Sequence, residues 1–271
     1  MKTLLATDLD GTLLNAERRA GERDLGTLRE LAAAGVCRAA VTGRSLHSVR
    51  RVLPPDFPID YLVFSSGTGI LDWRSGELLA TCSLPAAEVN RAARILRERN
   101  ANFMVHDPVP GNHLFLHFES RPEDTDYRRR RDYDPALARP LDPDSVLGEA
   151  AQLLAVLPPD LERFAALCQA LAGFQVIRTT SPLDGRSIWL EIFPVEASKA
   201  QGCAWLVEHL GLDRDHTYCL GNDYNDLDML EWGAHAAVVA NAPEDLRARF
   251  PVTVSHNHNP LTAACAAWGL R

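Results

Sequence analysis

The stretch that decides the fold lies near the start of the chain: Thr3-Leu4-Leu5-Ala6-Thr7-Asp8-Leu9-Asp10-Gly11-Thr12-Leu13. Its first part, residues 3–7, predicts a strand, and Gly11 lets the chain turn sharply after it. Asp8 and Asp10 are so close that their charges repel unless a cation lies near them. Magnesium, which prefers hard oxygen ligands, would supply that charge and would also hold a phosphate. The segment therefore predicts a strand that ends in a reactive site, although Asp-Gly alone is also a common turn.

Strands and helices alternate on the C-terminal side of that stretch and again late in the chain. The pattern predicts strands over 3–7, 38–42, 61–65, 217–220 and 236–239 and helices over 22–34, 46–53, 199–210, 226–232 and 261–268. Gly35 and Gly211 stand where two of these helices should end. Alternation of this kind is typical of a parallel sheet. The predicted fold class is α/β, with a doubly wound parallel-sheet (Rossmann-like) core.

The pattern changes between these two segments to longer polar loops, proline-rich joints and a strand–helix–strand run over 153–157, 161–171 and 175–179. We interpret residues 85–187 as an inserted α+β domain, and residues 1–84 and 188–271 as the core domain. Ligands of open parallel sheets bind beyond the carboxyl ends of the strands. The residues that follow strands in the two outer segments are therefore expected to converge on one site.

Composition excludes several classes of function. The 271-residue chain has a formal net charge of −8, which gives no basic field for nucleic acid or anionic lipid. Its one basic run, Arg128–Arg131, lies among acidic residues and is typical of a solvated surface. No apolar stretch approaches the roughly 18 residues that span a bilayer. A small-molecule substrate is therefore expected, with neither a nucleic-acid nor a membrane partner.

Cysteine usage indicates a reducing compartment. The six cysteines are scattered, form no C-x-x-C pair, and follow no signal-peptide-like start. Reduced thiols that pack as small hydrophobic side chains are the expectation, and the predicted localisation is cytoplasmic.

Three further segments place polar side chains at predicted strand ends. Thr42 and Gly43 follow the second strand, where a hydroxyl and backbone N–H groups could hold phosphate oxygens. Lys199 begins a helix, a position that the helix dipole disfavours for a cation unless an anion is near. The last segment is Gly221-Asn222-Asp223-Tyr224-Asn225-Asp226, rich in oxygen-bearing side chains. Each of these signals is weak alone, because Thr-Gly joints, exposed lysines and Asp/Asn turns are all common.

Together and in this order, the four segments resemble the motif set of the haloacid dehalogenase-like hydrolase superfamily. Asp8-x-Asp10-Gly11-Thr12 matches the first motif, Thr42 the second, Lys199 the third and residues 221–226 the fourth. Residues 65–67, Ser-Ser-Gly, are similar to the segment after the third strand of Cof-type sugar phosphatases. The place of the insert resembles the C2 cap of the Cof-type and sucrose-phosphatase-like subfamily.

The resemblance implies a magnesium-dependent phosphatase acting on a small phosphate monoester, with a sugar phosphate expected. Asp8 would attack phosphorus to give an aspartyl phosphate, and Asp10 would act as general acid and then as general base. Lys199 would take part in catalysis, and it would also bind phosphate together with Thr42 and Gly43. The implied metal-side residues are Asp8, Asp10, Asn222, Asp223 and Asp226. Asn222 departs from the family, which usually has Asp there, and Asp226 could orient Lys199 instead.

Other functions remain as alternatives. A phosphomutase on the same scaffold would show the same motifs, and a catalytically weak binding or regulatory protein is suggested by Asn222. A plain nucleotide-binding domain is disfavoured, because no G-x-G-x-x-G or P-loop follows the first strand. The motifs leave the ester, the cap residues that would read the leaving group and the oligomeric state open.

Overall fold

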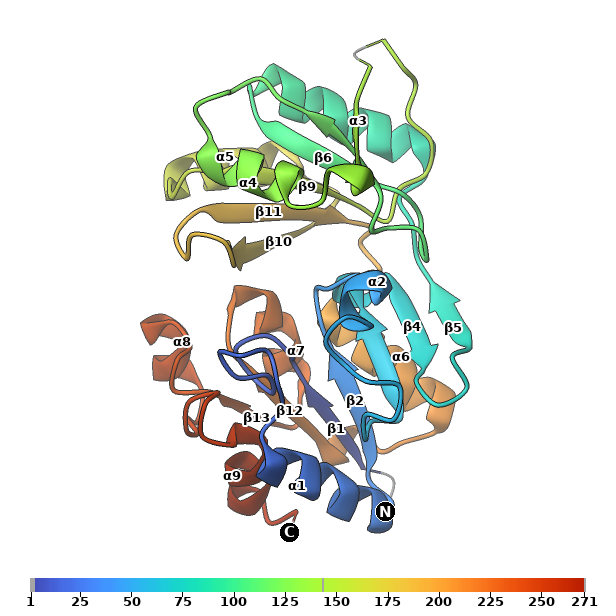
Figure 1. The fold of residues 1–271 in the computed structure, drawn as a ribbon, viewed down its shortest axis with the longest axis vertical. Coiled ribbons are helices and arrows are strands. Elements are labelled where there is room, and N and C mark those ends of the chain that lie inside the picture. Colours follow the sequence, from blue (N-terminus) through green and yellow to red (C-terminus); the bar gives the residue numbers. More distant parts are fainter. Residues whose placement is uncertain (1–2, 143, 271) are drawn as a thin grey trace. The chain divides into compact units, whose positions relative to one another are not determined.

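The computed structural model describes residues 3–142 and 144–270 (Figure 1). The chain forms two compact units. The first unit comprises the described residues up to Thr81 and those from Ser198 onward, and the second unit is Cys82–Ala197. No helix within the described residues is long and apolar enough to cross a membrane.

The first unit is built on a seven-stranded sheet with the order β13-β12-β1-β2-β3-β4-β5. The strands from β13 to β3 pair in parallel, whereas β4 and β5 are added antiparallel at one edge. The bounds are β1 Leu4–Thr7, β2 Cys37–Val41, β3 Tyr61–Phe64, β4 Gly69–Asp72, β5 Leu78–Thr81, β12 Thr217–Gly221 and β13 His235–Val238. Among the five parallel strands, the early strand β1 thus lies in the middle, between β2 and the late strand β12 (Figure 1).

Helices cover both faces of this sheet. Leu4 and Ala6 belong to a buried cluster with residues of α6 and α7, whereas Leu5 points to the opposite face and is also fully buried. The helices are α1 Glu22–Ala33, α2 Leu46–Val49, α6 Lys199–Leu210, α7 Leu227–Trp232, α8 Glu244–Arg249 and α9 Pro260–Ala267, with short 3-10 turns η1 Ser65–Gly67, η3 Arg214–His216 and η4 Tyr224–Asp226. The doubly wound core that the sequence predicts is confirmed.

The second unit holds a six-stranded sheet with the order β10-β11-β9-β6-β7-β8. Its strands are β6 Asn102–His106, β7 Phe115–Phe118, β8 Ala138–Pro140, β9 Gln152–Leu157, β10 Gln175–Thr180 and β11 Ile188–Phe193, and its helices are α3 Ala86–Glu98, α4 Thr125–Asp132 and α5 Leu161–Ala170, with η2 Pro135–Leu137. All its strand pairs are antiparallel except β7 with β8. Residues of α3 and α5 bury one face of the sheet.

The strand β11 belongs to a different unit from the one that the sequence analysis gave it. We expected the core domain to resume at residue 188, but β11 pairs with β9 and β10 in the second sheet. The two units separate only between Ala197 and Ser198. An apolar run predicts a strand, but it does not indicate which sheet the strand joins.

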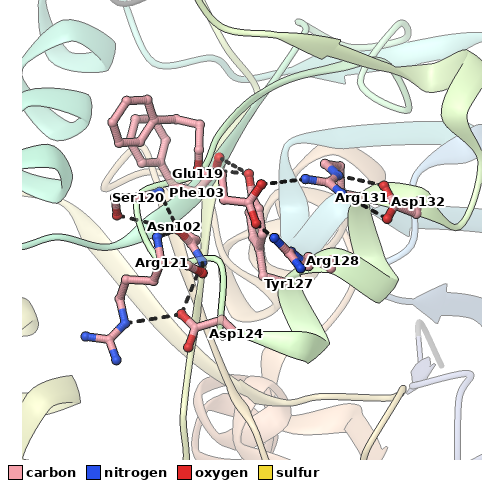
Figure 2. Close-up of polar contacts among 11 residues, drawn as sticks. Asn102, Phe103, Glu119, Ser120, Arg121, Asp124, Tyr127, Arg128, Arg131 and Asp132 are labelled. Atoms are coloured by element: carbon pink, nitrogen blue, oxygen red, sulfur yellow. Dashed lines mark hydrogen bonds and ion pairs between the residues drawn. The ribbon is translucent and has the colours of Figure 1, made fainter.

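The basic run of the sequence lies on α4 and is partly paired with acidic side chains. Glu119 accepts from Arg128 Nε and from Arg131 Nη1, each at 2.7 Å, and Arg131 also pairs with Asp132 at 2.6 Å (Figure 2). Arg130 instead lies over the ring of Phe115, 5.0 Å from its centroid. Two of the four arginines, Arg128 and Arg131, are therefore held in ion pairs.

A buried asparagine fixes the loop that leads into α4. The side-chain oxygen of Asn102 accepts from the backbone N–H groups of Ser120 and Arg121, at 2.7 and 2.8 Å, and its nitrogen donates to the Arg121 carbonyl at 2.7 Å (Figure 2). These contacts use most of the hydrogen-bonding capacity of the amide, so its burial costs little.

Candidate active site

Four of the side chains that the sequence analysis selected come together where parallel strands of the first unit end. Asp8 follows β1, Thr42 follows β2, and Asp226 lies just beyond β12. Lys199 is the first residue of α6, whose N-terminus is capped by Ser198 Oγ accepting from Gln201 N at 3.2 Å. This edge of a parallel sheet is where ligands of such folds bind.

Lys199 is the centre of the cluster. Its side chain is completely buried, and Nζ donates to Asp8 Oδ1 at 2.7 Å and to Asp226 Oδ1 at 2.5 Å. A buried ammonium is tolerated only when it is paired and hydrogen-bonded, and two carboxylates meet that need. Burial lowers the pKa of Lys199, but the charges and hydrogen bonds of Asp226 and Asp8 outweigh it and hold the pKa above the ordinary value. Lys199 is thus a permanent positive charge beside Asp8.

Asp8 lies in a tight turn at the end of β1. Its backbone N–H donates to the Leu220 carbonyl at 2.9 Å, and its own carbonyl accepts from Leu13 N at 3.3 Å. Burial raises the pKa of Asp8 to about 7, and although Lys199 lowers it, the nearby acids Asp226 and Asp10 raise it. A further positive charge at this carboxylate would favour its ionised, nucleophilic form.

Asp10 is held by an arginine that the sequence analysis did not select. Arg44 Nε lies 2.5 Å from Asp10 Oδ2, and Arg44 Nη2 lies 2.6 Å from Oδ1, a bidentate pair. The Asp10 side chain is 46% exposed, whereas that of Asp8 is 6% exposed. Arg44 follows Thr42-Gly43 directly, so a basic residue next to a suspected phosphate loop was the signal in the sequence.

The segment after β2 is fixed by the loop that follows β3. Thr42 is buried, its Oγ1 accepts from Arg44 N at 3.2 Å, and its carbonyl accepts from Ser66 N at 3.0 Å. Gly67 has φ +97°, and a Cβ added there would lie 2.2 Å from the Ser198 carbonyl oxygen. The glycine therefore lets this loop approach the start of α6. A Cβ on Gly43 would make only ordinary contacts, with its nearest atom at 3.5 Å.

Asp226 uses both carboxylate oxygens within the protein. Oδ1 accepts from Lys199, and Oδ2 accepts from the backbone N–H of Asn222 at 2.7 Å and of Asp223 at 3.1 Å. Asp223 in turn caps η4, because its side chain accepts from the backbone N–H of Asp226. The geometry therefore favours Asp226 as the residue that orients Lys199, which the sequence analysis named as its other possible role.

Asn222 lies beside both acids of the first motif. In the orientation that satisfies its neighbours, its side-chain nitrogen donates to the Asp10 carbonyl at 3.1 Å and to Asp8 Oδ2 and Thr12 Oγ1 at 3.2 Å each. A carboxylate oxygen, a backbone carbonyl and a side-chain amide thus meet at one point. Turning the amide over would present its oxygen there instead.

The oxygen atoms of these groups are ligands of the kind that a magnesium ion binds. Mg²⁺ binds through one or two carboxylates with carbonyl oxygens and water. Among the described residues, no group of three or more His, Cys, Asp or Glu side chains could hold a metal. The candidate set here has a different composition, because it combines Asp8, the Asp10 carbonyl and the Asn222 amide, with Asp223 on the same loop.

Comparison with known proteins agrees with the family resemblance of the sequence motifs. Residues 5–261 match the model of a family described as haloacid dehalogenase-like hydrolase. The chain is 29% identical over 290 residues to the HMP-PP phosphatase of Cronobacter sakazakii, covering 98% of this chain and 92% of the relative. It is 26% identical over 276 residues to the 5-amino-6-(5-phospho-D-ribitylamino)uracil phosphatase of Bacillus subtilis, with 94% of each covered. A solved sugar phosphatase of subclass IIB of the superfamily superposes with a TM-score of 0.79 at 18% identity, over 100% of both chains.

Proposed function

This chain is a phosphatase of the haloacid dehalogenase-like hydrolase family, and from that premise we propose that it hydrolyses a small sugar phosphate with the help of magnesium. The reaction proceeds through an aspartyl phosphate on Asp8. The observation that carries the proposal is the buried contact of Lys199 with Asp8 and Asp226 at the end of the central strand. The Lys199 ammonium favours the ionised form of the Asp8 carboxylate, which is the form that attacks phosphorus.

Asp8 supplies the nucleophilic oxygen. Its Oδ2 faces Asn222 and the Asp10 carbonyl, the side where oxygen ligands gather, and Oδ1 faces Lys199. Oδ1 is therefore the oxygen that attacks phosphorus, and Lys199 Nζ lies close enough to neutralise charge on the phosphoryl oxygens as the bond forms. The Thr42 hydroxyl and the backbone N–H of Gly43 contribute further donors for those oxygens.

Asp10 moves the protons. In its protonated form it gives a proton to the oxygen of the departing alcohol and becomes a carboxylate, and this carboxylate then takes a proton from the water that hydrolyses the aspartyl phosphate, which restores the acid. The bidentate contact with Arg44 fixes the direction of its carboxylate. One exposed acid can serve both steps because the leaving group and the water arrive on the same side of the phosphorus in turn.

Magnesium, when bound, would neutralise charge on the transferring phosphoryl group. Asp8, the carbonyl of Asp10 and Asn222 would hold it, and Asp223, on the same loop as Asn222, is a further candidate ligand. The ion would also bring the pKa of Asp8 down from about 7, so that the nucleophile is ionised at neutral pH. Asp226 takes no part in the metal site here, because Lys199 and two backbone N–H groups occupy its oxygens.

The substrate class rests on the relatives. One of them is named as an HMP-PP phosphatase, another as a 5-amino-6-(5-phospho-D-ribitylamino)uracil phosphatase, and the solved relative as a sugar phosphatase. The last two names specify phosphates of a sugar alcohol or a sugar. Hexose, pentose and sugar-alcohol phosphates are therefore the first compounds to test.

Phosphate release from a panel of such esters tests the proposal, with an aryl phosphate as a general substrate. Release should require magnesium, stop with chelator, and fall to background in Asp8→Asn. Asp24→Asn is the matched control, because Asp24 is a buried carboxylate of the same unit that contacts Thr262 instead. A folded protein that releases no phosphate from any ester would refute hydrolysis. Isomerisation of a sugar phosphate without phosphate release would instead favour a phosphomutase.

A further inference from the structure

We infer that Asn222 is a two-position switch of the metal site: its side-chain NH₂ group closes the metal-free site, and its oxygen faces the site when magnesium binds. The inference rests on the proposed function for the identity of the cation. It concerns a residue at which this chain departs from the usual pattern of its family, and it assigns that residue a role that an aspartate could not perform.

The metal-free position follows from the contacts. With its NH₂ group inward, Asn222 donates to Asp8 Oδ2, the Asp10 carbonyl and Thr12 Oγ1, at 3.1–3.2 Å. The Asp8 carboxylate and the Asp10 carbonyl can only accept, so an oxygen in the same place would face these two oxygens without a proton between them. An aspartate there would put a third carboxylate beside Asp8 and Asp10, which would repel them unless a cation were present.

The second position keeps one contact, with Thr12, but it turns the amide nitrogen toward hydrogen-bond donors, so a bound cation is needed to favour it. Thr12 is completely buried, and its hydroxyl can accept from the Asn222 nitrogen or donate to the Asn222 oxygen over the same 3.2 Å. Rotating the amide by half a turn therefore keeps this hydrogen bond. It replaces the donor that faces Asp8 and Asp10 by an oxygen ligand, which is what a hard cation requires.

The charges of the cluster agree with this reading. Counted as formal charges, Asp8, Asp10 and Asp226 are three negative groups, and Lys199 and Arg44 are two positive groups in direct contact with them. A neutral residue at 222 leaves one formal negative charge uncompensated, whereas an aspartate would leave two. The metal-free site is therefore stable in this chain, at the cost of a weaker attraction for magnesium.

Two variants separate this switch from a passive neutral ligand. Asn222→Asp should lower the unfolding midpoint in EDTA by about 2–8 °C, since it replaces hydrogen bonds by repulsion. It should also lower the Kd for magnesium by about tenfold or more, because added ligand charge tightens such sites. Asn222→Ala should lower the midpoint in EDTA as well, but it should raise the Kd for magnesium. Both variants thus lose metal-free stability, and they change magnesium affinity in opposite directions.

The measurements are thermal unfolding in EDTA and in excess magnesium, and calorimetric titration of the metal-free protein with magnesium chloride. Asn241→Ala is the matched control, because its amide donates to the Gly11 carbonyl at 2.8 Å on the same turn, outside the acidic pair. It should lose some stability with the Kd unchanged. Asn225→Asp adds the same charge to the same loop and should change both quantities less than Asn222→Asp.

Either of two results would overturn the inference. One is an unchanged midpoint in EDTA for both Asn222 variants, which would show that the NH₂ group does not hold the metal-free site. The other is a magnesium Kd that Asn222→Asp leaves unchanged. Neither outcome depends on turnover, so a wild-type protein that releases phosphate with magnesium would keep the proposed function even if the switch failed. Conversely, the absence of turnover on every ester would leave these binding and stability results interpretable.

Discussion

Replacing Lys199 by methionine is expected to destabilise the first unit by about 3–5 kcal/mol in the absence of metal. The Lys199 side chain is completely buried, with hydrogen bonds of 2.7 and 2.5 Å to Asp8 and Asp226. Methionine fills nearly the same volume, so the cavity contribution is small. The loss comes from two carboxylates left in a buried site without a cation, for which removal of one partner typically costs about 3–5 kcal/mol.

Thermal unfolding in EDTA measures this loss. At about 2–4 °C per kcal/mol for a unit of this size, the midpoint should fall by about 6–20 °C. Adding Asp226→Asn to Lys199→Met removes one of the two uncompensated charges and should restore part of the stability. The deficit should also shrink at low pH, because the carboxylates can then take up protons.

A surface ion pair provides the control. Arg249 pairs with Glu231, and both side chains are about half exposed. Its loss in Arg249→Met should cost less than about 1 kcal/mol, as exposed pairs usually do. If Lys199→Met unfolded within about 1 kcal/mol of the wild type at pH 8, and Asp226→Asn gave no recovery, the cluster would not be the buried, mutually dependent set that the distances indicate.

Three further predictions follow from the same site. Arg44→Gln should slow the hydrolysis of alkyl phosphates more than that of an aryl phosphate with a good leaving group, because only the former needs protonation by a well-placed Asp10; equal slowing in a kcat comparison would contradict this role. In urea unfolding with EDTA present, the stability contributed by Asp8 should decrease as the pH rises from about 4 to about 7. The reason is that Asp8, with its pKa raised to about 7, keeps a proton in the folded protein, whereas the unfolded chain releases that proton near pH 3.8. That fall should be absent from Asp8→Asn. Gly67→Ala should lower the free energy of unfolding by more than about 2 kcal/mol in the same assay, because residue 67 has φ +97° and its Cβ would lie 2.2 Å from the Ser198 carbonyl oxygen. A loss below about 1 kcal/mol would show that the loop can move away from Ser198.

The sequence predicted the first unit well because its signals are local. The strands over β1, β2 and β3 are short apolar runs, and Gly211 ends α6 with φ 57°, as a helix C-terminus requires. The run over β9, α5 and β10 was also recognised by its own pattern. The strands β6, β7 and β8 were not assigned, because polar residues such as His106 and His117 interrupt their apolar pattern, although β6 and β7 pair as neighbours in the sequence.

The structure brings Asp8, Thr42 and Asp226 to the predicted edge of the sheet, because residues after parallel strands converge there, and the start of α6 brings Lys199 to them. The contacts among these side chains could not be predicted from the sequence. Whether Asp226 orients Lys199 or binds metal depends on which oxygens its neighbours occupy. The clamp of Arg44 on Asp10 depends on the reach of a long side chain, which no spacing rule encodes. The placement of β11 failed for the same reason, since sheet membership is decided by partners distant in the chain.

The central position of β1 affects how the chain can fold during its synthesis. Leu4 of β1 pairs with Cys37 of β2 and with Thr217 of β12, so more than two hundred residues are made between the strand that ends in Asp8 and its second neighbour. At roughly 5–20 residues per second, that delay is on the order of 10–40 s. The second unit is a continuous stretch, Cys82–Ala197, and is complete before β12 leaves the ribosome. The second unit can therefore form while the sheet of the first unit still lacks β12, and Asp226, which follows β12, becomes available to Asp8 only after that strand has been made.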